Sequence, residues 1–340
     1  MITPIEAKPW NRAYLPKRVL AIRLQAMGDV VITLPYLQAL RNMLPADVRI
    51  DFLTRGEVGY IPKSLQLFSK VYCIKGGRVF IKQLFYTVLL LPRLLMNRYH
   101  VVIDLQNNRL SRLVCNIIRP EAWSAFDRFS PLPAGERTRL TIEAVELGEV
   151  TASTCFAFKT NPCINELLKA NGWDGISRLV ILNPAGAFTT RNWPLLNYVL
   201  FAKLWLQYFP STQFVVAGTS AIAAKAIYMQ QQQDIKLINL TGKTTPVQVF
   251  AIIQKAWFML SEDSGLMHMA WVNNIFTIAL FGSTRSDWSR PLGEKSLLVS
   301  SADLPCGDCM REKCSYGDVH CLTRHTPEIM AEKIMAFLNL

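Results

Sequence analysis

This chain lacks the long apolar run that a membrane-spanning helix requires. Its longest apolar stretch, residues 84–96, is interrupted by Pro92 and Arg93 and is shorter than the roughly 20 residues that cross a bilayer. Residues 1–18 are basic and contain no apolar core segment, so they do not form a secretory signal. We therefore expect a cytoplasmic protein in which the eight cysteines remain reduced.

The chain is also poor in acidic residues. It has 25 Asp and Glu against 37 Lys and Arg, which gives a net charge of +12. Such a balance suits a polyanionic partner. No segment interleaves aromatic with basic residues in the way typical of RNA-binding strands, so no nucleic acid is predicted. An anionic membrane surface or a phosphorylated glycan is favoured instead.

The apolar pattern alternates between short strand-like runs and longer helical ones. Strands are predicted at residues 19–24, 48–53, 71–74, 100–105, 179–182, 214–217, 236–238, 257–260 and 275–281, and helices at 30–43, 79–97, 195–208, 221–231, 246–256, 265–272 and 327–338. This alternation is typical of doubly wound parallel sheets. The irregular segment 149–177 predicts a boundary between domains at residues 1–160 and 176–325, followed by a terminal helix at 326–340.

The first strand-to-helix turn lacks the Gly-x-Gly-x-x-Gly motif of dinucleotide-binding proteins, since only Gly28 is present, and an NAD site is not expected. The same turn carries Asp29. A carboxylate at the carboxyl end of a strand can take a proton from an attacking hydroxyl. Asp is also common at helix starts, so Asp29 as a simple helix cap is the alternative.

Two turns of the second domain have features of a phosphate site. In residues 183–194, small residues permit close backbone approach, hydroxyls can donate hydrogen bonds, and an arginine can bind phosphate in a bidentate manner. In residues 259–270, a cap and a glycine open a helix whose first amides can receive an anion. The predicted ligand-binding residues of these two turns are Ala185, Gly186, Ala187, Thr189, Thr190, Arg191, Asp263, Ser264, Gly265 and His268.

These segments together resemble glycosyltransferase family 9, the ADP-heptose:lipopolysaccharide heptosyltransferases, over roughly residues 18–335. The family has Met-Gly-Asp after its first strand, Lys-x-Trp-Pro after a Gly-Ala turn, and a related Asp-Ser-Gly helix start. Its Leu-x-Gly turn, which passes near the nucleotide base, is matched at Gly242, so the resemblance adds Gly242 to the ligand-binding residues. The chain departs from the family at Arg191, which replaces the lysine, and after Ser220, where the ribose-binding acidic residue is missing.

The resemblance implies two Rossmann-like domains facing a cleft, the GT-B architecture, and an inverting glycosyltransferase. Asp29 would be the catalytic base, and Arg191 would stabilise the leaving diphosphate of a nucleotide sugar, ADP-heptose. The acceptor would be a phosphorylated, lipid-linked glycan of the lipopolysaccharide core, held by basic residues of the first domain. Candidates for that role are Arg55, Arg109, Arg112, Arg137 and Arg139.

Further expectations concern the oligomeric state, the place in the cell and two alternative functions. We expect a monomer, peripheral at the inner face of the cytoplasmic membrane, although most apolar side chains of the helix at 79–97 should pack on the sheet. A nucleotide-sugar epimerase of the same fold is one alternative function. A non-catalytic, membrane-associated glycan-binding relative is another.

Four cysteines near the end of the chain have the spacing Cys-x2-Cys-x4-Cys-x6-Cys, at Cys306, Cys309, Cys314 and Cys321. Four thiolates can complete a tetrahedral structural zinc site. Reduced packing cysteines are the favoured interpretation for a cytoplasmic protein. No Asp-x-Asp motif is present, so neither a catalytic metal nor a cofactor is expected.

Overall fold

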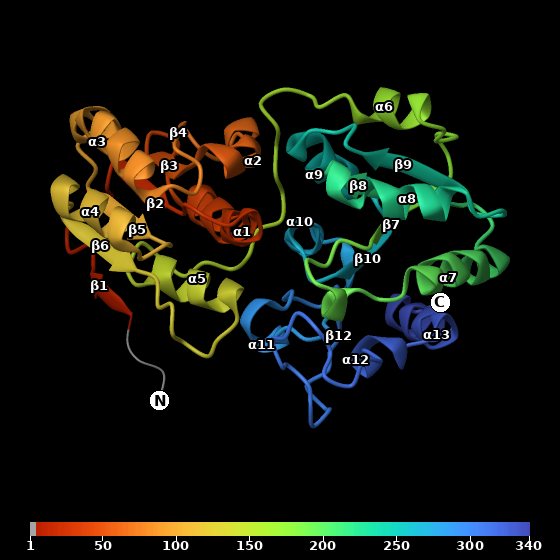
Figure 1. The fold of residues 1–340 in the computed structure, drawn as a ribbon. Coiled ribbons are helices and arrows are strands. Elements are labelled where there is room, and N and C mark those ends of the chain that lie inside the picture. Colours follow the sequence, from red (N-terminus) through yellow and green to blue (C-terminus); the bar gives the residue numbers. More distant parts are fainter. Residues whose placement is uncertain (1–4) are drawn as a thin grey trace. The chain divides into compact units, whose positions relative to one another are not determined.

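A computed structural model describes residues 5–340, so the first four residues of the predicted N-terminal domain lie outside it. The chain folds into two compact units, Met1–Asn161 and Pro162–Leu340 (Figure 1). The boundary lies inside the irregular segment 149–177. Among residues 5–340, no helix is long and apolar enough to cross a membrane.

The N-terminal unit is built on a six-stranded sheet of order β1-β6-β5-β2-β3-β4. Its neighbours are parallel except for the antiparallel pair of β1 and β6. The strands are β1 (Glu6–Lys8), β2 (Arg18–Ile22), β3 (Arg49–Arg55), β4 (Lys70–Ile74), β5 (Val101–Asp104) and β6 (Ala122–Ala125). The helices are α1 (Met27–Met43), α2 (Tyr60–Ser64), α3 (Phe80–Met96), α4 (Arg109–Ile118) and α5 (Ala134–Glu143), with the 3-10 turn η1 (Gly56–Val58).

The C-terminal unit has a second six-stranded sheet, parallel throughout, in the order β12-β11-β10-β7-β8-β9. Its strands are β7 (Arg178–Asn183), β8 (Thr212–Gly218), β9 (Leu237–Thr241), β10 (Phe258–Glu262), β11 (Phe276–Leu280) and β12 (Ser296–Val299). Its helices are α6 (Ile164–Ala170), α7 (Leu195–Tyr208), α8 (Ala223–Gln230), α9 (Pro246–Lys255), α10 (Gly265–Val272), α11 (Ser286–Ser289), α12 (His320–Thr323) and α13 (Pro327–Leu338), with 3-10 turns η2 (Thr189–Arg191) and η3 (Ser220–Ile222).

All nine predicted strands and all seven predicted helices are present, and the α/β prediction is confirmed. The short strands β1, β6 and β12 were not predicted, because each has only three or four residues. Helix α13 begins after the Thr326 cap, whose hydroxyl accepts a hydrogen bond from the N–H of Ile329 at 3.4 Å. It packs against α7 and is therefore part of the C-terminal unit.

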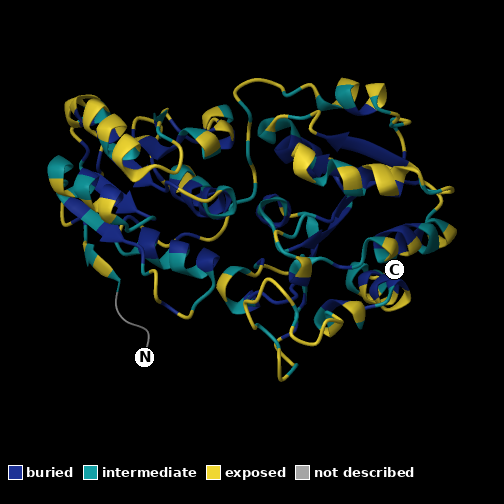
Figure 2. Cartoon of the chain, in the orientation of Figure 1, coloured by how far each residue is buried: buried dark blue, intermediate teal, exposed yellow. Residues whose placement is uncertain are grey.

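The expectation for helix α3 is wrong. Only Thr87, Leu91 and Leu94 of this 17-residue helix are buried. Figure 2 shows the strands dark with burial, whereas much of α3 is exposed. The sequence is apolar around most of the helix, so the pattern did not indicate which apolar face packs against the protein.

An aromatic cluster forms the centre of the C-terminal core. The Trp205 ring on α7 lies 5.6 Å from Phe201, 4.6 Å from Phe209 and 4.9 Å from Phe258, between ring centroids. Its side chain is fully buried. Because interiors are close-packed, this indole fixes how α7 sits on the sheet, and α7 follows directly from the loop at residues 184–194.

Trp205→Ala should lower the free energy of unfolding by about 3–5 kcal/mol, since it leaves a large cavity. Leu200, on the same helix but 41% exposed, is the matched control. Leu200→Ala should change stability by less than about 0.5–1 kcal/mol. Urea denaturation followed by circular dichroism measures both, and equal losses would show that the cluster is not central to the core.

Candidate functional site

The predicted ligand-binding turns of the C-terminal unit lie at one edge of its sheet. Parallel strands end at the same edge, and open α/β sheets bind ligands there. The segments after β7, β9 and β10 carry all of the residues predicted for this unit. The sheet therefore brings together segments that are far apart in the sequence, as the 2.7 Å hydrogen bond from Asn183 Nδ2 to Ser264 Oγ, 81 positions away, shows.

Glu262, the last residue of β10, holds both ends of the loop after β7. Its Oε2 accepts a hydrogen bond from the N–H of Gly186 at 2.6 Å, and its Oε1 accepts one from the N–H of Trp193 at 2.8 Å. Burial raises the pKa of this carboxyl to about 7, against the lowering effect of the two N–H groups and Lys225. A single buried carboxylate thus shapes the whole loop.

The glycine at position 186 is required by this packing. A Cβ there would lie 2.6 Å from the carbonyl oxygen of Arg191 and 2.9 Å from Glu262 Oε2. Both distances are below van der Waals contact, and one partner is backbone. Ala185 and Ala187 flank Gly186 in the same turn, so the predicted small-residue run allows the loop to fold tightly over Glu262.

Arg191 is held in a defined position within this loop. Its Nη1 lies 3.4 Å from Asp263 Oδ2, and its guanidinium carbon lies 4.8 Å from the centroid of the Phe188 ring. The buried Nε atom has no hydrogen-bond partner among the described residues. A donor left in this state favours an anionic acceptor, which is what a diphosphate supplies.

The two threonines connect the loop after β7 to the cysteine-containing segment. Thr189 Oγ1 donates to the carbonyl of Glu312 at 3.0 Å, and Thr190 Oγ1 donates to that of Arg311 at 2.6 Å. Thr190 is also buried. Their donor capacity is used inside the chain, so they attach the loop to the cysteine-containing segment, and a ligand could use only their acceptor capacity.

Helix α10 begins as the sequence predicts. Ser264 is its N-cap and accepts from the N–H of Met267 at 3.4 Å, while Gly265 opens the first turn. His268 is only 6% exposed, and its Nδ1 accepts from the indole of Trp271 at 3.1 Å. The first-turn amides remain the predicted anion site, whereas one ring nitrogen of His268 is committed to the helix interior.

The turns after β8 and β9 lie side by side. Gly242 has φ of +69°, a conformation that favours glycine, and its N–H donates to the carbonyl of Gly218 at 2.8 Å. Thr219 and Ser220 are exposed beside it. The structure thus brings the predicted Gly242 turn against the loop that lacks the acidic residue.

In the N-terminal unit, Asp29 caps helix α1 and is also accessible to solvent. Its Oδ2 accepts a hydrogen bond from the N–H of the N-cap residue Ala26 at 2.9 Å. Its Oδ1 lies 2.9 Å from Nη2 of Arg23, and the side chain is 38% exposed. Capping and solvent access therefore coexist, and the helix cap holds the carboxylate in place.

Asp29 lines a basic pocket of about 430 Å³ at the carboxyl edge of the sheet. It is lined by Arg23, Gln25, Ala26, Asp29, Arg78, Gln106, Phe126, Arg128 and Arg137. The guanidinium carbons of Arg23 and Arg137 lie 4.8 and 5.2 Å from the centroid of the Phe126 ring. Four arginines and one carboxylate give this pocket a net positive charge, which suits a phosphorylated ligand.

Of the arginines predicted to hold an acceptor, only Arg137 lines this pocket. Arg139 pairs with Glu136 and with Glu143 on its own helix, and these hydrogen bonds raise its pKa. Arg55 pairs with Glu57 at 2.9 Å. Arg109 and Arg112 line a separate hollow with Arg128. Arg23, Arg78 and Arg128 were missed, although Arg23 directly follows the first strand.

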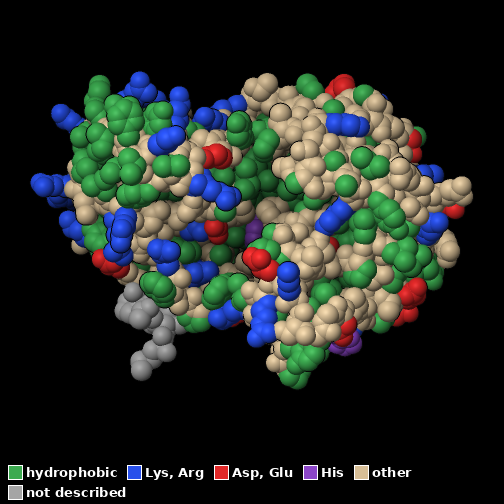
Figure 3. Space-filling view, in the orientation of Figure 1, with side chains coloured by type: hydrophobic (Ala, Val, Ile, Leu, Met, Phe, Trp, Pro, Cys, Tyr) green, Lys and Arg blue, Asp and Glu red, His purple; other side chains and the backbone are tan. Residues whose placement is uncertain are grey.

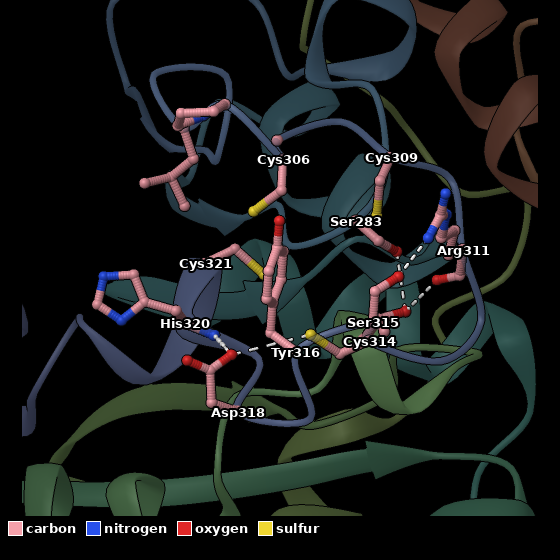
Figure 4. Close-up of a pocket in the computed structure, with 14 residues that line it drawn as sticks. Ser283, Cys306, Cys309, Arg311, Cys314, Ser315, Tyr316, Asp318, His320 and Cys321 are labelled. Carbon is pink, nitrogen blue, oxygen red and sulfur yellow. Dashed lines mark hydrogen bonds between the residues drawn. The ribbon is translucent and has the colours of Figure 1, made fainter.

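The four C-terminal cysteines line one cavity of about 650 Å³ (Figure 4). Hydrogen bonds from backbone groups lower the pKa of Cys314, and the one from Val319 has the largest effect. Burial raises the pKa of Cys321. All eight cysteines of the chain are free thiols. Across residues 5–340, no group of three His, Cys, Asp or Glu side chains is arranged to hold a metal ion.

Glu262 is the main site residue that the sequence analysis missed. The predicted strand ended at Leu260, whereas β10 continues for two residues and buries Ser261 and Glu262 completely. The apolar run ends at Leu260, so the pattern does not indicate that Glu262 is buried. The available signal was the place of Glu262 one residue before the predicted Asp263–Gly265 turn. A buried carboxylate needs hydrogen-bond donors close by, and such a turn lies where other loops can supply them.

Glu262→Gln should remove a pH-dependent contribution to stability. The pKa of about 7 lies above the ordinary value, so the folded state binds the proton more tightly. The contribution of Glu262 to the free energy of unfolding is therefore complete below about pH 4.5, and it is lost as the pH rises through 7. The wild type should therefore lose stability relative to the glutamine variant between pH 5 and 8, in denaturant titrations at each pH.

At every pH the side-chain NH2 group of the glutamine would face one of the two backbone N–H groups. That N–H would then have no acceptor, which costs about 1–3 kcal/mol. Exposed Glu294 provides the control, and Glu294→Gln should change stability by less than about 0.5 kcal/mol. A pH-independent difference between wild type and Glu262→Gln would show that Glu262 does not titrate in this range.

Comparison with known proteins agrees with this arrangement. Residues 163–320 match the family model of glycosyltransferase family 9 (heptosyltransferase). Lipooligosaccharide heptosyltransferase 2 of Campylobacter jejuni is 27% identical over 175 residues, which cover 50% of this chain and 53% of that protein. The aligned part of the chain thus spans about half the length of this relative.

Solved structures extend the likeness over both units. A family 9 glycosyltransferase from Veillonella parvula superposes with a TM-score of 0.75 at 15% identity, over 95% of this chain and 98% of that one. ADP-heptose LPS heptosyltransferase II of Escherichia coli gives 0.71 at 16% identity, over 95% and 98%. The shared fold is GT-B. The family match thus spans most of the C-terminal unit, and the fold match spans nearly the whole chain.

Proposed function

We propose that this protein is an inverting glycosyltransferase that moves a heptose from ADP-heptose onto a phosphorylated acceptor of the lipopolysaccharide core. The observation that carries the proposal is the placement of Asp29, a fixed and accessible carboxylate in an arginine-lined pocket. A carboxylate in this setting can accept a proton, while the surrounding cations attract a phosphorylated substrate.

The donor would bind at the edge of the C-terminal sheet. Arg191 offers a buried Nε donor, Asp263 orients its guanidinium, and the first turn of α10 offers backbone amides. Negative charge grows on the diphosphate as its bond to the sugar breaks. Fixed donors aimed at that charge stabilise the transition state more than the ground state.

The reaction would be a single displacement. The acceptor oxygen forms a bond to the anomeric carbon as the bond from that carbon to the diphosphate oxygen breaks. The electron pair of the broken bond leaves with ADP. The proton of the attacking hydroxyl passes to the carboxylate of Asp29, and the configuration at the anomeric carbon is inverted.

Further parts of the proposal concern the setting of the enzyme. We place it as a monomer at the inner face of the cytoplasmic membrane, where a lipid-linked acceptor is accessible to a basic protein. The four cysteines that line the C-terminal cavity would bind no metal ion. Of the alternatives, the epimerase has less support, because the family match and the relatives named above are glycosyltransferases. A non-catalytic relative would have no need of the Asp29 pocket.

Asp29→Asn should reduce heptose transfer by about 10²–10⁴-fold, because general-base loss has this magnitude. ADP release from ADP-heptose is measured with and without a heptose-deficient core acceptor. Asparagine keeps a carbonyl oxygen to accept the N–H of Ala26, so the melting temperature should change little. Exposed Asp47 is the control, and Asp47→Asn should be fully active; wild-type turnover of Asp29→Asn would leave only the capping role.

Arg191→Ala should weaken ADP binding and slow transfer, with a loss of roughly 1.5–3 kcal/mol for one charge-assisted contact. Arg191→Lys should restore most of both, because the charge is kept. Exposed Arg290 is the matched control on the same unit. Isothermal titration with ADP and initial rates test this, and unchanged binding by Arg191→Ala would exclude a leaving-group role.

A further inference from the structure

Helix α3 exposes an apolar face along its whole length. The exposed side chains follow the spacing of one helix face, which spans about 22 Å at 1.5 Å per residue. They are Ile81, Phe85, Val88, Leu89, Pro92, Leu95 and Met96, and we call this set the α3 face. Ile81 is 76% exposed and Met96 81%. Isolated exposed apolar residues are common, but a continuous face of this size marks an interaction site.

The opposite side of the helix is the one that packs. Thr87, Leu91 and Leu94 are buried, and they lie about half a turn of the helix away from Ile81 and Phe85. This packed side contacts α4 and β4. The apolar residues of the α3 face are therefore surplus to the core of the unit, and the described chain does not cover them.

The charge around the α3 face is of one sign. From residue 58 to residue 103 the chain contains no Asp or Glu. In the same segment it contains Lys63, Lys70, Lys75, Arg78, Lys82, Arg93 and Arg98. Figure 3 shows hydrophobic side chains gathered over α3, with Lys and Arg side chains around them. An apolar strip bordered by cations matches a surface that is apolar inside and anionic outside.

We propose that the α3 face docks into the surface of an anionic lipid bilayer, parallel to the membrane plane. An interfacial helix needs an apolar face to enter the acyl boundary and basic residues to meet anionic headgroups. Lys82 and Arg93 flank the α3 face along the helix and are exposed. The helix lies on the membrane and does not cross it, since its other side is fixed to the protein.

This inference goes beyond the proposed reaction, because docking needs neither donor nor turnover. A second copy of the chain is the alternative occupant of an apolar face. A dimer formed through two α3 faces would bring the basic border of one copy against the basic border of the other. The repulsion between these like charges disfavours such a dimer. The lipid surface is the occupant whose charge is complementary.

The test is co-sedimentation of the full chain with phosphatidylcholine vesicles, with and without phosphatidylglycerol, at low and high salt. The wild type should bind the anionic vesicles and be partly released by salt. The triple variant Ile81→Ser, Phe85→Ser, Leu89→Ser should partition at least about tenfold more weakly, since each buried apolar side chain supports about that factor.

A control variant carries the same number of exposed apolar substitutions in the C-terminal unit, at Ile176, Leu196 and Ile227. It should bind vesicles like the wild type. Lys82→Gln with Arg93→Gln should weaken binding mainly at low salt. Circular dichroism and melting temperature confirm that each variant is folded.

Equal vesicle binding by the α3-face variant and the wild type would overturn the proposal. So would a loss of self-association by that variant in sedimentation velocity with no change in vesicle binding, because the occupant would then be a second copy. Transfer to a soluble, delipidated acceptor should be unchanged in the α3-face variant, so failure of docking and failure of the proposed reaction give different results.

Discussion

The buried carboxylate of Glu262 is the constraint on which the C-terminal site depends. It binds the backbone N–H groups of Gly186 and Trp193, and the residues between them form the loop that carries Arg191. Burying a charge is costly unless hydrogen bonds compensate for it. Here the compensating donors are the two ends of one loop, so the requirement to satisfy the carboxylate becomes a requirement on the loop's shape.

Asp29 in the N-terminal unit also uses its two oxygen atoms for separate contacts. One oxygen completes the cap of α1, and the other meets Arg23 beside the basic pocket. These contacts reduce the rotamers available to the side chain, so the carboxylate is pre-organised. Because one oxygen caps the helix and the other lies at the pocket, the structural role of Asp29 does not exclude the chemical role proposed for it.

Much of the fold was predictable because buried parallel strands are apolar runs bounded by turns, and β2, β7 and β11 have that form. The turns after β2, β7 and β10 carry the candidate site residues Asp29, Arg191 and Ser264. Two things could not be predicted. The burial of Glu262 depends on hydrogen-bond donors 69–76 positions away, and the packed face of α3 could not be identified because apolar residues occupy both sides.

The glycine at position 186 has a consequence for the substitutions that this chain can accept. Any side chain there would collide with the carbonyl of Arg191 and with Glu262, so the loop after β7 has no room for a larger residue at that position. Thr219 and Ser220, in the turn after the neighbouring strand β8, are exposed. Sequence change is therefore better tolerated in the β8 turn than at Gly186.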